Sequence, residues 1–254
     1  MIVKTPSPWR VLATQTSAAQ TPSTVSYIRS PTMNNKNQFA GDKKVGESIL
    51  TPAEKKLKDW LVPKIPSNVE TYHLTMTTVL WSLGVILFGY LAGFNRQWVW
   101  MISLMIILQY LTDLADGEVG RRRNTGLVKW GFFMDHLLDY IFLCCLVFAG
   151  YLMAPENTQI WFIPLLIIMG AFMANSFLSF AATNEFEIYH YGLGPTESRI
   201  VFIIINAYIA FFGFGHFFWI MPLVCAVTLI ALIIYTWQIH KKLWQIDMQV
   251  KENQ

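Results

Sequence analysis

The sequence predicts an all-α integral membrane protein with six transmembrane helices, preceded by a juxtamembrane amphipathic helix. Of its 254 residues, 54% are hydrophobic and only 14% are charged, whereas a soluble domain usually carries about a quarter charged residues. The apolar residues also come in blocks of roughly twenty, the length needed to cross the bilayer core. The strand alternation of a membrane barrel is absent, and helices satisfy their own backbone hydrogen bonds in lipid.

Residues 1–50 are predicted to form a disordered N-terminal tail. The stretch up to residue 41 is rich in Ser, Thr, Pro, Gln and Asn and contains no Asp or Glu, a composition that cannot bury a core. No apolar run of the signal-peptide type is present. Two alternatives stay open: Met33 is the true start, or the basic, Ser-rich stretch is a transit peptide.

A short amphipathic helix is predicted in the sequence TPAEKKLKDWL, which begins at Thr51. Thr51 is placed to cap this helix, and Glu54 completes a capping box. Leu57, Trp60 and Leu61 share one helical face, with lysines on the others. We therefore expect this helix to lie on the membrane surface.

A membrane domain is predicted over residues 51–242, followed by a cytoplasmic C-terminal tail over residues 243–254. The fifth span is short and ends at GFGHFF, so the last two spans could form a tight helical hairpin. The predicted spans are Thr75–Phe94, Trp98–Ala115, Phe132–Met153, Ile160–Ala181, Ile200–Phe214 and Phe218–Trp237.

Basic residues gather on one side of the predicted membrane domain, which places that side and both termini in the cytoplasm. They are Lys55, Lys56, Lys58, Lys64, Arg121, Arg122, Arg123, Lys129, Arg199, Lys241 and Lys242. The net charge of +3 is small, and its juxtamembrane position suits anionic lipids better than nucleic acid. The three cysteines fall inside spans and are interpreted as packing residues. We expect a multi-pass protein of a bacterial inner membrane.

Charge is concentrated in the segment DLADGEVGRRRNTGLVKWGFFMDHLLD. Asp113 and Asp116 share a helix face at the end of span two, and Asp135 and Asp139 share one at the start of span three. The two pairs can therefore face each other at the cytoplasmic end of the bundle. Ionisable groups in a membrane domain mark functional sites, and a cluster of carboxylates suits Mg²⁺ or Mn²⁺. Such ions also bind substrate phosphates, so the segment predicts phosphate chemistry at a membrane surface, reinforced by Arg121–Arg123.

This segment resembles the CDP-alcohol phosphotransferases, also called CDP-alcohol phosphatidyltransferases, whose pattern is D-x2-D-G-x2-A-R-x8-G-x3-D-x3-D. The matching residues are Asp113, Asp116, Gly117, Arg121, Gly131, Asp135 and Asp139. The chain departs from the pattern at Gly120, where the family has Ala. It also has nine residues, not eight, between Arg121 and Gly131, which shifts the linker side chain that would reach the nucleotide.

The resemblance implies a phospholipid-synthesis enzyme that transfers a substituted phosphate group from a CDP-alcohol to an acceptor alcohol and releases CMP. It also implies two divalent ions, Mg²⁺ or Mn²⁺, and a homodimer. Asp139 would be the general base. The metal ligands would be Asp113, Asp116, Asp135 and Asp139, and the residues against CDP would be Gly117, Arg121, Thr125 and Gly131. The family often adds a nucleotide contact at the start of span one, here YHLT (Tyr72–Thr75).

A second segment, YHYGLGPTESRI, lies on the same predicted side of the membrane. Its GPTE resembles a segment of several family members, including amino-alcohol phosphotransferases that act on diacylglycerol. Glu197 and Arg199 are therefore expected to help bind the acceptor, although GPTE is by itself a good helix start. The likeness favours, by a small margin, a lipid acceptor over a CDP-diacylglycerol donor with a small polar acceptor.

Two other functions fit parts of this pattern. An intramembrane prenyltransferase also uses aspartate-rich metal sites, but usually has more spans and lacks the D-G-x2-A-R arrangement. A cation or proton transporter could use the aspartates as a relay. A transporter would be expected to carry charges near the membrane midplane, often in repeated halves, and neither is apparent here.

Overall fold

The computed structural model describes residues 44–45, 50–124, 127–183, 186–187 and 195–253. Apart from three of its residues, the predicted N-terminal tail lies outside the described part of the chain, as does Thr125. The described residues are almost entirely α-helical, which confirms the predicted fold class. A two-residue parallel pairing joins β1 (Lys44–Val45) to β2 (Phe186–Glu187).

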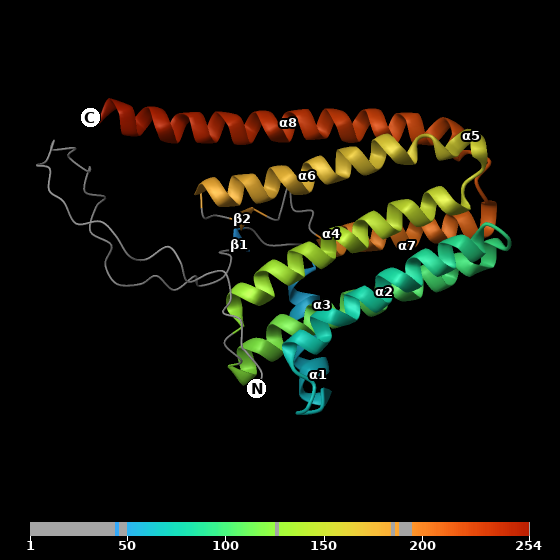
Figure 1. The fold of residues 1–254 in the computed structure, drawn as a ribbon, viewed down its shortest axis with the longest axis horizontal. Coiled ribbons are helices and arrows are strands. Elements are labelled where there is room, and N and C mark those ends of the chain that lie inside the picture. The colour runs from blue at the N-terminus through green and yellow to red at the C-terminus, as the bar shows by residue number, and fades with distance from the viewer. Residues whose placement is uncertain (1–43, 46–49, 125–126, 184–185, 188–194, 254) are drawn as a thin grey trace, which may run out of the picture. The chain divides into compact units, whose positions relative to one another are not determined.

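The helices follow the predicted order along the chain (Figure 1). They are α1 (Thr51–Leu61), α2 (Thr71–Ala92), α3 (Val99–Arg123), α4 (Val128–Met153), α5 (Glu156–Gln159), α6 (Phe162–Thr183), α7 (Pro195–Phe212) and α8 (Phe217–Glu252). Short 3-10 turns occupy Val62–Lys64 and Arg96–Trp98. Six of the described helices are long and apolar enough to cross a membrane, which confirms the six predicted spans.

Helix α1 forms as predicted, but its start differs from the predicted capping box. The residue at the cap position is Leu50, and no side chain caps the helix, so the assignment of Thr51 as the cap was wrong. The Glu54 carboxylate instead accepts a hydrogen bond from Thr196 Oγ1, 2.5 Å away on α7. Trp60 is largely exposed, and the Lys64 ammonium lies over its ring. An exposed aromatic beside a lysine is typical of a helix at a membrane interface.

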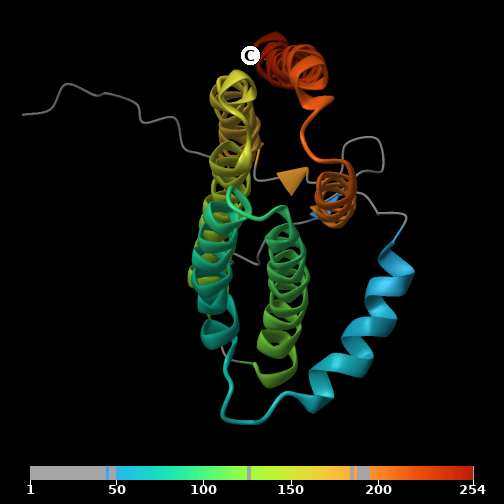
Figure 2. The same ribbon diagram turned by 90° about the vertical axis from the view of Figure 1, so that its right-hand side faces the viewer.

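The long helices run side by side, and α2 packs against both α3 and α4 (Figures 1 and 2). Helix α3 also contacts α7, α4 contacts α6, and α6 contacts α8. A Cβ atom at Gly89 on α2 would lie 2.5 Å from the Cβ of Ala149 on α4. The close approach of these two helices therefore requires glycine, in keeping with the small residues that pack membrane helices.

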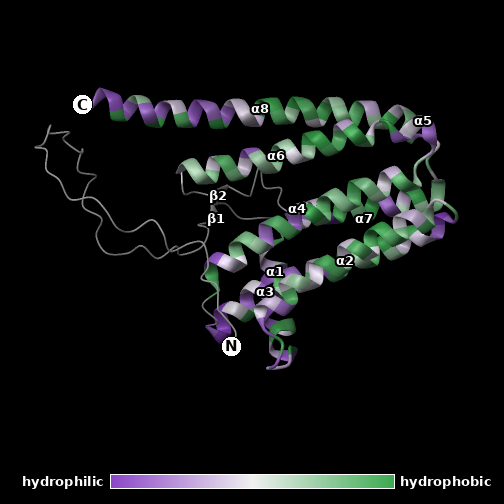
Figure 3. Cartoon of the chain, viewed as in Figure 1, coloured by the Kyte–Doolittle hydropathy of each residue, from purple (hydrophilic) through white to green (hydrophobic). Residues whose placement is uncertain are grey.

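Hydrophobic residues make up much of the helix bodies (Figure 3), and many of their large side chains are exposed. Large exposed side chains include Leu83 on α2, Ile167 and Leu178 on α6, and Phe211 on α7. A water-soluble protein rarely exposes so much contiguous apolar surface, whereas lipid tails solvate it. The protein is therefore a multi-pass membrane protein.

The last two spans differ from the predicted tight hairpin. Four residues join α7 to α8, starting with Gly213, whose φ of 72° suits glycine. On either side of that turn the two helices have different neighbours, because α7 packs on α3 and α8 packs on α6. Helix α8 also continues through Glu252, so most of the predicted C-terminal tail is helical.

Candidate active site

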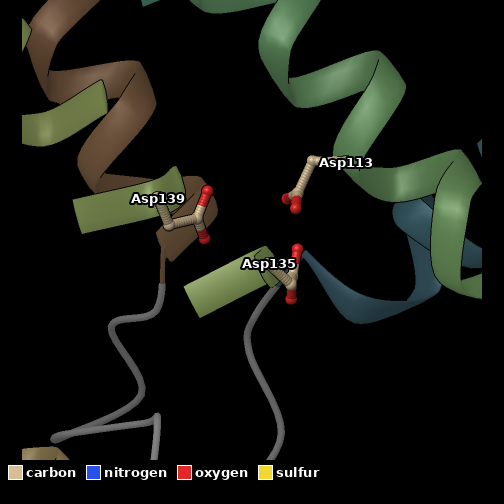
Figure 4. Close-up of side chains that lie close together, drawn as sticks. All are labelled: Asp113, Asp135 and Asp139. Atoms are coloured by element: carbon tan, nitrogen blue, oxygen red, sulfur yellow. The ribbon is translucent and has the colours of Figure 1, made fainter. Parts of the chain in front are cut away.

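The structure brings three of the four predicted aspartates together (Figure 4). Asp113 lies on α3, and Asp135 and Asp139 lie one turn apart on α4. Each offers one carboxylate oxygen, and these three oxygens lie within 4.8 Å of one another. Asp135 and Asp139 share one face of α4, because residues four apart on a helix lie on the same side. Both carboxylates therefore point toward Asp113 on α3.

Asp116 is the fourth predicted ligand, and it is not part of this group of three. It is buried on α3, and its Oδ2 accepts a hydrogen bond of 2.8 Å from Thr75 Oγ1. Thr75 is the last residue of YHLT on α2, the segment where the family resemblance predicted a contribution to the nucleotide site. The contact to Asp116 joins the start of α2 to the aspartate-bearing end of α3.

Arg199 on α7 is the cation that meets the carboxylates. Its Nη2 lies 2.8 Å from Asp113 Oδ2 and 3.5 Å from Asp139 Oδ1, and its side chain is only 12% exposed. The guanidinium also lies over the ring of Tyr110, 5.6 Å from its centroid. The predicted acceptor residue Arg199 is thus inside the carboxylate cluster, while Glu197 lies in the first turn of the same helix.

Gln109 on α3 was not predicted as a site residue. Its side chain is fully buried, and its Nε2 donates a 2.9 Å hydrogen bond to Asp139 Oδ1. The sequence did contain one sign that Gln109 belongs to the site. It lies one turn before Asp113, and residues at this spacing share a helix face. A polar side chain inside a membrane helix is itself a sign of function.

The arginines after α3's aspartates make contacts away from the carboxylate cluster. Arg121 and Arg122 each bind the Glu118 carboxylate, at 2.8 and 2.9 Å. Arg122 also lies 2.7 Å from Asp59 of α1. With a side chain 66% exposed, Arg121 has a surface ion pair that is worth little, so it is available to a phosphate group.

Arg123, the last residue of α3, holds the loop that leads into α2. Its guanidinium donates hydrogen bonds to four backbone carbonyls, those of Ile65, Pro66, Ser67 and Val69. Carbonyl groups in a loop need such donors when they are withdrawn from water. Arg123 is therefore a structural residue in this arrangement, rather than part of a phosphate site.

The two glycines of the matched pattern leave room on their helices. A Cβ at Gly131 would meet no described atom within 4 Å, and one at Gly117 would meet only Arg121 Nη1, at 3.6 Å. Neither glycine is therefore required by packing within the described residues. Space at these positions is what a closely approaching ligand needs.

A cavity of about 220 Å³ lies between α1, α3 and α7. Its wall is mostly apolar, and Glu54, Tyr110, Thr196 and Arg199 contribute the polar groups. Arg199 also contacts Asp113, so it links this cavity to the carboxylate cluster. The apolar lining residues are Leu50, Ala53, Leu57, Ile106, Ile107, Ile200 and Ile203.

A family model and a known protein both match this chain. The family model for CDP-alcohol phosphatidyltransferase matches residues 71–240, which include all four aspartates. Inner membrane protein YnjF of Escherichia coli (strain K12) is 34% identical over 110 residues, covering 42% of this chain and 49% of that protein. The match thus spans about half the length of that relative. No solved structure matches the chain significantly.

Proposed function

This chain belongs to the CDP-alcohol phosphatidyltransferase family, and on that premise we propose that it transfers a substituted phosphate group from a CDP-alcohol to an acceptor alcohol. The observation that carries the proposal is the meeting of Asp113, Asp135 and Asp139 at one end of α3 and α4. We place this end, both termini and the reaction at the cytoplasmic face, on the distribution of basic residues.

The donor set fits a divalent metal ion. Three carboxylates with oxygens within 4.8 Å of one another offer only hard oxygen ligands, which suit Mg²⁺ or Mn²⁺. We propose that Asp113, Asp116, Asp135 and Asp139 hold two such ions. Bound ions would neutralise charge on the donor diphosphate and on the departing CMP.

Asp139 is proposed as the general base. Its carboxylate takes the proton from the acceptor hydroxyl, and the acceptor oxygen forms a bond to the phosphorus that carries the donor alcohol. The bond from that phosphorus to the oxygen of CMP breaks, and CMP leaves with both bonding electrons. Arg199 offsets the negative charge of Asp113 and Asp139 and is placed to orient the acceptor.

One substrate is proposed to be a lipid, and the cavity between α1, α3 and α7 supports this. Its apolar wall suits a hydrocarbon chain, and Arg199 lies in both the cavity wall and the carboxylate cluster. The polar nucleotide would approach from water, against Gly117, Arg121, Thr125 and Gly131. We propose a small-alcohol CDP donor with a lipid acceptor, and a homodimer, as the family resemblance suggests.

The test is CMP release by the purified full chain in lipid vesicles. Radiolabelled CDP-alcohols, including CDP-diacylglycerol and CDP-linked small alcohols, are supplied with lipid and polar acceptors. We expect CMP release with one donor class, complete loss with EDTA, and recovery with Mg²⁺ or Mn²⁺. No CMP from any donor would refute the transfer, and turnover that persists in EDTA would refute the metal requirement.

A further inference from the structure

Among the described residues, Gln109 is the uncharged side chain that donates a hydrogen bond to Asp139, the proposed base. Its amide is fully buried in α3, and its Nε2 donates to Asp139 Oδ1 at 2.9 Å. Arg199 approaches the same oxygen, at 3.5 Å, from α7. Two donors on two different helices thus converge on one oxygen of Asp139.

The orientation of the Gln109 amide is set by the charge that it faces. If the amide were turned over, its Oε1 would lie against the Asp139 carboxylate, and two acceptors would repel each other. In the observed orientation, Oε1 is buried and has no hydrogen-bond partner among the described residues. A buried carbonyl left without a donor costs free energy, so an apolar side chain of equal size would serve packing better.

We propose that Gln109 is a positioning residue that fixes the Asp139 carboxylate in the metal site. The inference rests on the function proposed above. By holding Oδ1, Gln109 leaves Oδ2 to face a metal ion or the acceptor hydroxyl, because the described residues make their contacts to Asp139 through Oδ1. Partners that orient metal-binding side chains in this way strongly affect metal affinity or activity.

A mutant cycle on Mn²⁺ affinity tests the proposal without relying on turnover. Four forms of the full chain are purified in lipid nanodiscs: wild type, Gln109→Met, Asp139→Ala and the double variant. Mn²⁺ binding in the presence of CDP is followed by electron paramagnetic resonance. Methionine keeps the length of glutamine but donates no hydrogen bond, so we expect Gln109→Met to weaken Mn²⁺ binding by about tenfold or more.

The same substitution should act differently once the Asp139 carboxylate is gone. If Gln109 works through Asp139, Gln109→Met in the Asp139→Ala background should change Mn²⁺ affinity by less than about twofold. Equal weakening in both backgrounds, wild-type affinity in the single variant, or no Mn²⁺ binding by the wild type would each overturn the proposal. Should Gln109→Met fail to fold, Gln109→Leu takes its place in the cycle.

Asn206→Leu is the matched control. Asn206 is a buried amide on α7 that donates a 3.1 Å hydrogen bond to Ser103 on α3, so it joins the same helix by the same kind of bond. We expect this variant to keep wild-type Mn²⁺ affinity, and comparable weakening would overturn the proposal by pointing to general loosening of α3.

CMP release by the same proteins separates the two proposals. We expect Gln109→Met to lower kcat by about tenfold or more, with little change in KM for the CDP-alcohol. A raised KM with normal kcat would contradict the positioning role. A wild type that binds Mn²⁺ but releases no CMP would refute the transfer function, while the binding cycle would still decide whether Gln109 orients Asp139.

Discussion

The carboxylate cluster and the basic linker, which begins with Arg121–Arg123 and ends before Gly131, are neighbours in sequence but differ in what they contact. Asp113, Asp135 and Asp139 lie on regular turns of α3 and α4 and converge on one point. The adjacent arginines turn elsewhere, Arg122 to Glu118 and Asp59, and Arg123 to the loop before α2. The cation that meets the carboxylates comes from α7, far away in the sequence.

Burial explains why this difference matters. The Arg199 side chain is 12% exposed, whereas that of Arg121 is 66% exposed. An exposed ion pair contributes at most about 1 kcal/mol, while removing one partner of a buried pair is far more costly. The cluster should therefore be sensitive to substitution, whereas the exposed ion pairs of Arg122 should be dispensable.

Asp139→Asn should have the largest effect on the cluster. The asparagine amide keeps the size of the carboxylate but cannot take the proton from the hydroxyl of the acceptor alcohol. The transfer rate should therefore fall by about 10²–10⁴-fold. Single-turnover CMP release measures the loss, and Mn²⁺ binding with CDP should stay measurable because the other aspartates remain. Normal turnover in this variant would remove the assignment of Asp139 as the base.

The contrast between the two arginine environments is tested by one substitution in each. Arg199→Met removes the donor shared by Asp113 and Asp139, and the loss of about 2–3 kcal/mol should lower kcat/KM for the acceptor on the order of a hundredfold. Arg122→Met removes only surface pairs, worth about 1 kcal/mol or less, and should leave the acceptor kinetics within about fivefold of wild type. Equal losses in the two variants would mean that Arg122 also belongs to the site.

The spacing of the aspartates predicted their meeting because it depends on local geometry. Asp135 and Asp139 share a face in any α-helix, and a short connection returns α4 to the end of α3. The six spans were predictable for a similar reason, since they depend on composition and length alone.

Contacts between helices were harder to predict. The hydrogen bond from Gln109 to Asp139 depends on how α3 is rotated against α4. Both helices pack on α2, and close approaches such as the one between Gly89 on α2 and Ala149 on α4 are not apparent from a single sequence. The capping prediction failed for a related reason, because Glu54 has a partner on α7 that a local pattern cannot reveal.

Gly131 lies one turn before Asp135, and its substitution tests whether the nucleotide contacts the start of α4. A Cβ there meets no described atom within 4 Å, and alanine favours the helix more than glycine does, so Gly131→Ala should not lower the melting temperature. If the CDP moiety lies against this glycine, a clash of about 1 kcal/mol should raise KM for the CDP-alcohol about fivefold. An unchanged KM would place the nucleotide elsewhere.

Gly150→Ala on the same helix shows what a packing effect looks like in the same assay. Its Cβ would lie 2.3 Å from a ring carbon of Phe162, so the added methyl group must displace the packing of α4 against α6. We expect a lower melting temperature, by an amount that reflects about 1–3 kcal/mol of overpacking, with KM for the CDP-alcohol near that of the wild type. A raised KM in Gly131→Ala and a lowered melting temperature in Gly150→Ala would separate a ligand contact at Gly131 from a helix contact at Gly150. Of these two glycines, only Gly131 faces open space among the described residues.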